Sequence, residues 1–156
     1  LVVTLKSNLL HGLGLTQSSV YLSRFAGDRV NKDNELGISV TLLPNFTAAE
    51  LSSPQAPLAE MATDVDLGAF NGKSKLKGIV LLANKGQSPL EIKMLQVYNP
   101  GLSVSLPKTT LRPGETTEMK IVVSTAVDRF RGSRKVLLIT NDPRHPKILV
   151  NVTTKK

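Results

Sequence analysis

The chain of 156 residues contains no cysteine and no tryptophan, and aromatic residues make up only 4% of it. Without cysteine, disulfide bonds, thiolate metal sites and cysteine nucleophiles are all excluded. The redox compartment stays open, because a chain without cysteine fits both the cytosol and an oxidising environment. Hydrophobic residues still make up 40% of the chain, which is enough for the core of one domain of ordinary size.

Long apolar runs and helical periodicity are also missing. No apolar run reaches the roughly 18 residues that indicate a membrane-spanning helix, so none is expected. The chain begins with LVVTLKSN, which contains neither methionine nor a basic n-region. We therefore expect that any signal segment has already been removed.

Positive charge is distributed unevenly along the chain. The formal net charge is +8, yet residues 1–58 hold four lysine or arginine residues and four acidic residues. The whole excess therefore lies in residues 59–156. A charge difference between two parts of a chain indicates two domains.

Residues 60–156 consist of short β-branched and aliphatic runs separated by turn sequences. Seven strands are predicted, at residues 63–70, 76–83, 90–98, 102–106, 118–124, 136–140 and 148–153. The first strand of the closing pair, 136–140, is apolar or β-branched on both faces, which indicates burial on both sides. The apolar phase shifts between Met94 and Leu95, which predicts a β-bulge in that strand.

Turn chemistry supports the same interpretation. Arg112-Pro113-Gly114-Glu115 has the composition of a type II turn. Asn141-Asp142-Pro143 separates the two strands of a closing hairpin. Short strands with such regular turns predict an all-β, immunoglobulin-like (Ig-like) β-sandwich of about seven strands.

Residues 1–43 repeat the order of the end of the chain. LVVTLKSN resembles MKIVVSTA, SVYLSRFAGD resembles KVLLITND, and ELGISVTLL resembles ILVNVTT. We therefore predict that residues 1–43 are the last three strands of a preceding Ig-like domain, a partial second copy. Residues 44–59, rich in Pro, Ser and Ala, are predicted as a linker, and 60–156 as a complete domain. Because three strands cannot bury both faces alone, either the missing strands precede residue 1 in a longer chain, which we favour, or another surface covers them.

Three stretches resemble a known family of bacterial Ig-like domains. They are DVDLGAF at 64–70, LLANKGQSPLEI at 81–92, and LRPGETTEMKIVV with the later VLLITNDPRHPKI. The family consists of Bacteroidetes domains of unknown function. It is related to the Hydin/abnormal-spindle type and, more distantly, to major sperm protein and PapD-like sandwiches. The resemblance covers about residues 60–156 and implies the fold and an envelope protein, but no activity.

One departure from that family concerns cofactors. Many members carry Cys-Gly-Cys just after the third strand, where this chain reads Val97-Tyr98-Asn99-Pro100-Gly101-Leu102. A metal or redox role of those cysteines therefore does not carry over, and no cofactor is expected.

Catalytic patterns are lacking. His11 and His145 lie in different predicted domains, and His145 stands between turn prolines, where a solvated residue is expected. Asp64 and Asp66 share one face of a strand, and paired carboxylates can bind Ca²⁺. No glycine-rich acidic loop surrounds them, so a solvated strand face is the simpler interpretation. We predict neither an enzyme nor a metal site.

Basic residues form the strongest candidate binding site. The candidates are Arg129, Arg131, Arg134 and Lys135 in one loop, and Lys73, Lys75 and Lys77 at alternating positions in another segment. If the two groups meet, they form a polyanion-binding patch, and otherwise they are a solvated charged surface. Nucleic acid is disfavoured, because stacking aromatics and a groove-reading helix are both missing.

These features favour a non-enzymatic interaction or structural module in the envelope of a Gram-negative bacterium, in the periplasm or at the cell surface. It would bind a protein or glycan partner through loops or by strand addition at a sheet edge. Two alternatives stay open. One is binding of acidic glycans, lipid headgroups or nucleic acid through the basic loops. The other is a periplasmic chaperone of PapD type, which needs a basic pair between two complete domains.

Overall fold

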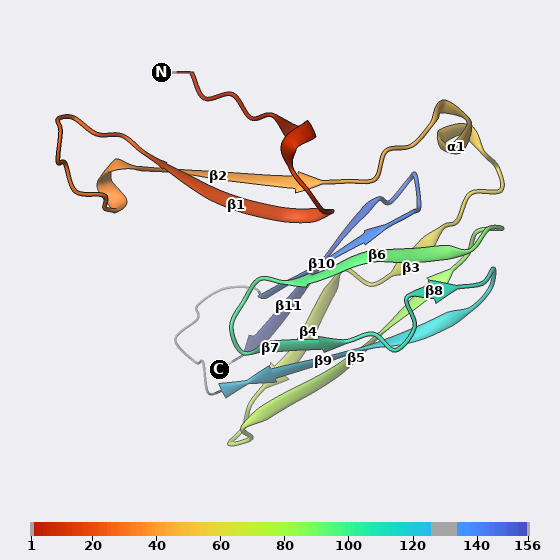
Figure 1. Cartoon of the computed structure of the whole chain (residues 1–156). Coiled ribbons are helices and arrows are strands. Elements are labelled where there is room, and N and C mark those ends of the chain that lie inside the picture. The colour runs from red at the N-terminus through yellow and green to blue at the C-terminus, as the bar shows by residue number, and fades with distance from the viewer. Residues whose placement is uncertain (1, 126–133, 156) are drawn as a thin grey trace. The chain divides into compact units, whose positions relative to one another are not determined.

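The computed structural model describes residues 2–125 and 134–155 (Figure 1). The chain divides into two compact units, Leu1–Leu42 and Leu43–Lys156. Within the described residues, no helix has the length and apolar character that crossing a membrane requires.

The first unit is a single antiparallel hairpin. Its strands are β1 (Gly14–Tyr21) and β2 (Glu35–Leu42), and short 3-10 helices lie at Ser7–Leu9 and Lys32–Asn34. Gly14 is the only buried residue among those described in this unit. The hairpin therefore has strand pairing but no hydrophobic core.

The repeat predicts a strand in LVVTLKSN, which is wrong over the described residues 2–8. No strand forms there, and Ser7 begins a 3-10 helix instead. An alternating apolar pattern forms a strand only where a neighbour accepts its backbone hydrogen bonds, and no described strand pairs with residues 2–8. β1 begins at Gly14, five residues before the segment SVYLSRFAGD that the repeat matched to a strand.

The second unit is an Ig-like β-sandwich, which confirms the predicted fold class. One sheet has the order β4-β11-β10-β6-β8 and the other the order β3-β5-β9-β7. Its described strands are β3 (Ala59–Met61), β4 (Asp64–Ala69), β5 (Lys75–Asn84), β6 (Leu90–Val97), β7 (Leu102–Ser105), β8 (Thr110–Leu111), β9 (Thr116–Ser124), β10 (Arg134–Thr140) and β11 (Lys147–Lys155). Neighbouring strands are antiparallel except β4 and β11, which run parallel. The seven predicted strands are present, and β3 and β8 add two that are only three and two residues long.

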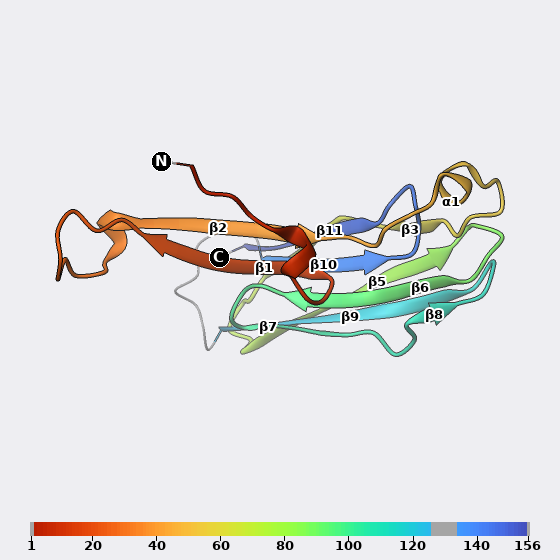
Figure 2. The same ribbon diagram turned by 45° about the horizontal axis from the view of Figure 1, so that its top comes forward.

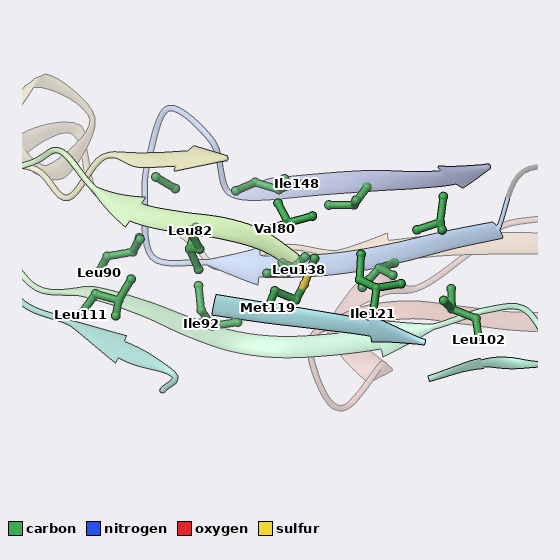
Figure 3. Close-up of a cluster of buried hydrophobic side chains, with 14 of the residues drawn as sticks. Val80, Leu82, Leu90, Ile92, Leu102, Leu111, Met119, Ile121, Leu138 and Ile148 are labelled. Carbon is green, nitrogen blue, oxygen red and sulfur yellow. The ribbon is translucent and has the colours of Figure 1, made fainter. Parts of the chain in front are cut away.

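Alternation of apolar residues builds the core between the two sheets. Burial alternates residue by residue along β5 and β9, so every second side chain points inward. Figure 3 shows these side chains meeting between the sheets, with Met119 near Leu138 at the centre. The fully buried large side chains are Leu82, Leu90, Leu111, Met119, Ile121, Leu137, Leu138, Ile139, Val123, Val136, Val150 and Val152.

Both predicted local irregularities are present. The register between β6 and β10 shifts so that Ile139 pairs with Met94 but Thr140 pairs with Ile92, which leaves Lys93 as the extra residue of a bulge. The turn before β9 closes with a bond from the Glu115 amide to the Arg112 carbonyl, 2.9 Å long. Gly114 has φ of +76° there, as position i+2 of a type II turn requires.

Residues 44–59 contain the short helix α1 (Ala48–Ser52). Thr47 caps this helix and Glu50 bonds back to Thr47, an arrangement known as a capping box. Further along, the Gln87 and Lys85 amides donate to the carbonyls of Ala56 and Leu58. The assignment of 44–59 to a linker stays a prediction, although its last residues bond to the sandwich.

Candidate functional site

Lys75 and Lys77 lie on β5 and point away from the core. Both are exposed, whereas Leu76 between them is buried. Lys73 is exposed in the preceding turn, where its amide donates to the Phe70 carbonyl. Lys75 and Lys77 therefore share one side of β5, whereas the orientation of Lys73 with them stays a prediction.

The second basic group is only partly described. Arg129 and Arg131 lie outside the described residues. Arg134 begins β10 and is 3% exposed, so the structure does not place it on the surface. Lys135 is exposed, and its amide donates to Asn99 Oδ1 over 2.7 Å. Because β10 and β5 belong to different sheets, no single patch joining Lys135 with Lys75 is shown, and the polyanion patch stays a prediction.

The paired carboxylates of β4 are exposed and bonded to neighbours. Asp64 accepts from Asn151 Nδ2 at 3.0 Å, and Asp66 pairs with the Lys155 ammonium at 3.1 Å. The hydrogen bond from the Gly68 amide and, to a lesser extent, the one from the Lys155 ammonium hold the pKa of the Asp66 carboxyl below its usual range. No group of three or more metal-ligating His, Cys, Asp or Glu side chains occurs within the described part of the chain.

Asp142 is a buried hydrogen-bond acceptor, although its place in Asn141-Asp142-Pro143 indicates only a turn. Its side chain is inaccessible to solvent. It accepts from the amides of Ala59 and Arg144, at 2.9 and 2.8 Å, and lies 2.9 Å from His145 Nδ1. The ring of His145 is half exposed. This carboxylate therefore ties the β10–β11 loop to the start of β3. An Asp before a turn proline was the available signal, but burial could not be deduced from it.

Asn84 has the same role at the end of β5. Its Oδ1 accepts from the Gly86 amide at 3.0 Å, and its Nδ2 donates to the Ser88 and Leu111 carbonyls at 2.8 and 3.0 Å. The side chain is completely buried. The hydrogen-bonding groups of Asn84 are thus used within the sandwich, which makes it a structural residue.

The outer face of β5 combines apolar and basic side chains. Ile79 and Leu81 are 58% and 57% exposed, and they continue the row begun by Lys75 and Lys77. We call these four residues the outer β5 face. Exposed aliphatic side chains of this size on a sheet face are typical of an interaction surface when they lie together.

Neighbouring β9 extends this face sideways. Cross-strand partners are Val122 for Lys77, Lys120 for Ile79 and Glu118 for Leu81. Figure 1 shows β9 running alongside β5, with β7 on the other side of β9, and Figure 2 shows the same sheet turned by 45°. β9 pairs with β5 from Lys75 to Ala83. On the other side of β5, residues of β3, β4 and β5 line a groove of about 620 Å³.

The two packed sheets and their strand order define an Ig-like β-sandwich domain. The model of the HYDIN/CFA65/VesB-like Ig-like domain family matches residues 57–155, and the chain belongs to that family. The resemblance to a Hydin-type Ig-like family is thereby confirmed. A search of curated proteins finds no match.

Two solved structures share the fold at low sequence identity. A protein of unknown function from Porphyromonas gingivalis W83 aligns with a TM-score of 0.70 and 23% identity, covering 92% of this chain and 66% of that one. The VesB protease of Vibrio cholerae aligns with a TM-score of 0.53 and 15% identity, covering 69% of this chain and 33% of that one. This chain therefore spans less than two thirds of the length of either relative.

Proposed function

We propose that the chain is a non-enzymatic interaction module of a longer bacterial envelope or secreted protein. The observation that carries this proposal is the outer β5 face, where Ile79 and Leu81 are more than half exposed beside Lys75 and Lys77. The buried polar side chains Asn84 and Asp142 are used in holding loops to the sandwich. The exposed aliphatic and basic side chains of the outer β5 face are, in contrast, suited to contact with another macromolecule.

The location of that protein is also a proposal. The similarity in fold to a Porphyromonas gingivalis protein of unknown function, together with the match to the HYDIN/CFA65/VesB-like family, supports a Bacteroidetes-type envelope or secreted protein. By the same reasoning we propose that residues 1–43 are the closing part of a preceding Ig-like domain. The exposure of Val20, Leu22 and Leu36 in the hairpin supports this, because such side chains are expected to pack on further strands.

A photo-crosslinking experiment tests the proposed function. A photoreactive residue replaces Leu81 on the outer β5 face in one variant, and replaces the exposed Lys93 on β6 in a control. Both are exposed to native cell-envelope extract at low and high salt. We expect one protein partner crosslinked at position 81 and retained at high salt, but not at position 93. Equal crosslinking at both positions, or none at either, would contradict the proposal.

Polyanion binding is the second candidate, because Lys73, Lys75 and Lys77 are all exposed and close in sequence. Binding to immobilised heparin should then fall steeply with salt, and reversal of two charges in Lys75→Glu/Lys77→Glu should remove it. Heparin binding that survives both changes would exclude these lysines. The chaperone alternative needs two complete domains, and nothing among the described residues favours it.

A further inference from the structure

One edge of β5 is only partly paired. β3 pairs with β5 at three positions, from Ala59 opposite Asn84 to Met61 opposite Leu82. On the other side, β9 pairs with β5 along its length, from Lys75 to Ala83. Within the described part of the chain, no strand therefore pairs with the β3-side edge of β5 between Lys75 and Ile79.

The direction of the backbone groups on that edge follows from two hydrogen bonds. The Asn84 amide donates toward the β9 side, to the Glu115 carbonyl, and the Lys85 amide donates toward the β3 side, to the Leu58 carbonyl. Backbone groups alternate between the two sides of a strand. The N–H and C=O groups of Lys75, Lys77 and Ile79 therefore point to the open edge.

Packing inside the sandwich keeps this edge open. After Met61 the chain crosses into the other sheet as β4, and there it pairs with β11. The β4 side chain Leu67 lies against Gly78, where a Cβ atom would overlap it. β4 thus fills the space beneath Gly78 with a side chain. The groove described above lies at the β3 end of the open edge, where Ile79 and Leu81 line it, and not beside Lys75 and Lys77.

Side chains beside the open edge favour one kind of occupant. Lys75, Lys77 and Ile79, whose backbone groups point to the open edge, also carry their side chains on the outer β5 face. Leu81 continues that row of side chains, so the face is basic at one end and aliphatic at the other. Lysines on an edge oppose pairing with a second, similarly basic copy. They favour an incoming strand that carries acidic residues opposite them and aliphatic residues opposite Ile79 and Leu81.

We propose that the open edge of β5 binds an extended acidic-aliphatic peptide segment of another protein by strand addition. This rests on the proposed interaction function and assigns it a site and a class of ligand. The added strand continues the β3 position of the sheet, forms backbone hydrogen bonds with Lys75, Lys77 and Ile79, and places its alternate side chains on the outer β5 face.

A designed peptide tests the inference on the full chain. The probe is the capped peptide Val-Thr-Val-Ser-Glu-Thr-Glu, which in antiparallel register places valine opposite Leu81 and Ile79 and glutamate opposite Lys77 and Lys75. In that register the amides of its third and fifth residues point to β5, and those of its second and fourth residues point away. Calorimetry or fluorescence anisotropy gives the dissociation constant.

Two modified peptides separate strand addition from simple charge attraction. N-methylation of the third and fifth residues should weaken binding at least tenfold, whereas N-methylation of the second and fourth should leave it within about twofold, because each lost backbone bond costs roughly 1 kcal/mol. Lys75→Glu/Lys77→Glu should also weaken binding at least tenfold. Lys147→Glu, an exposed lysine on β11 in the other sheet, is the matched control and should leave it unchanged.

Several outcomes would overturn the inference. The first is that the unmodified peptide does not bind, and the second is that the two N-methylated peptides bind equally well. The third is that the chain self-associates and that the peptide does not inhibit this self-association. In each case, a partner crosslinked at position 81 would still support the interaction function and would move its site to the sheet face. Loss of that crosslink as well would end both proposals.

Discussion

The hairpins β1–β2 and β10–β11 have similar sequences but opposite surroundings. In β10–β11, Val136 and Leu138 pair with Val150 and Ile148, and all four side chains are buried. In β1–β2, every position from Leu15 to Leu42 is at least partly accessible. The alternating pattern of a sequence is therefore enough to pair two strands. Burial of their side chains requires, in addition, a second sheet that packs on the hairpin.

Asp142 and Asp28 hold matching places in the aligned segments KVLLITND and SVYLSRFAGD, but they differ in the range of their contacts. Asp142 is fully buried and joins loops far apart in sequence, since it accepts from Ala59. Asp28 accepts from the side chain and amide of Arg24, four residues away. These two bonds hold the pKa of the Asp28 carboxyl below its usual range, and the bond from the Arg24 guanidinium has the larger effect. A similar residue thus has a long-range role in one unit and a local role in the other.

The largest expected effect comes from matched leucine truncations. Leu138→Ala removes a fully buried side chain from the sandwich core and should cost about 2–5 kcal/mol of unfolding free energy. Leu36→Ala removes a side chain that is 41% exposed in β2 and should change the second unit by no more than about 0.5 kcal/mol. Urea unfolding followed by circular dichroism measures both. Equal losses would remove the distinction between the units.

The second largest effect is expected from two glycine-to-alanine substitutions, one in each unit, which should differ in their cost to the free energy of unfolding. A Cβ atom at Gly86 would overlap the backbone of Ala56, Pro57 and Leu58, which cannot give way as a side chain can. Gly86→Ala should therefore cost about 1–3 kcal/mol. Gly37 in β2 has open space around its position, so Gly37→Ala should be close to neutral. A neutral Gly86→Ala in thermal unfolding would show that residues 56–58 do not pack on the turn.

The two aspartates offer a third comparison. Asp142→Ala leaves the buried amides of Ala59 and Arg144 without their acceptor and should cost about 1–3 kcal/mol. Asp28→Ala breaks only a local contact and should leave the unfolding midpoint of the sandwich unchanged. If the two variants shift that midpoint equally, Asp142 does not connect the loops as described.

The smallest effect concerns acid pH. The Lys108 ammonium, followed by the Arg112 amide, holds the pKa of the Glu115 carboxyl below its ordinary value. Because the carboxylate form is favoured in the folded state, its contribution is present above the unfolded pKa of about 4.3 and is lost as pH falls through the lower, folded pKa. Glu115→Gln should therefore flatten the decline in melting temperature below about pH 4.3. If the melting temperature of the variant declines with acid as steeply as that of the unmodified chain, other carboxylates cause the decline.

Much of the sandwich could be predicted from its sequence, because its local signals agree. Pro113-Gly114 specified the turn, the phase shift at Met94 specified the bulge, and alternating residues specified which faces of β9 and β11 are buried. β3 and β8 were not predicted, because strands of three and two residues are too short to show an alternating pattern. Helix α1 was missed for the same reason, although Thr47 and Glu50 mark its capping box.

The candidate site could be predicted only in part. Alternation placed Lys75 and Lys77 on one side correctly, but Arg134 is buried by its position at the start of a central strand. The exposure of Ile79 and Leu81 was not foreseen, because a sequence does not show which face of an apolar strand lacks a cover. The open edge depends on where β3 leaves the sheet, which is a property of topology and not of local pattern.

The comparison between the units is tested most directly by shortening the chain. Residues 43–156 alone should unfold cooperatively, with a melting temperature within about 2 °C of that of the full chain, which corresponds to less than about 1 kcal/mol. Residues 1–42 alone should show the circular dichroism of an unfolded chain, because their hairpin has no core. Loss of cooperative unfolding in 43–156, or a stable fold in 1–42, would contradict the account.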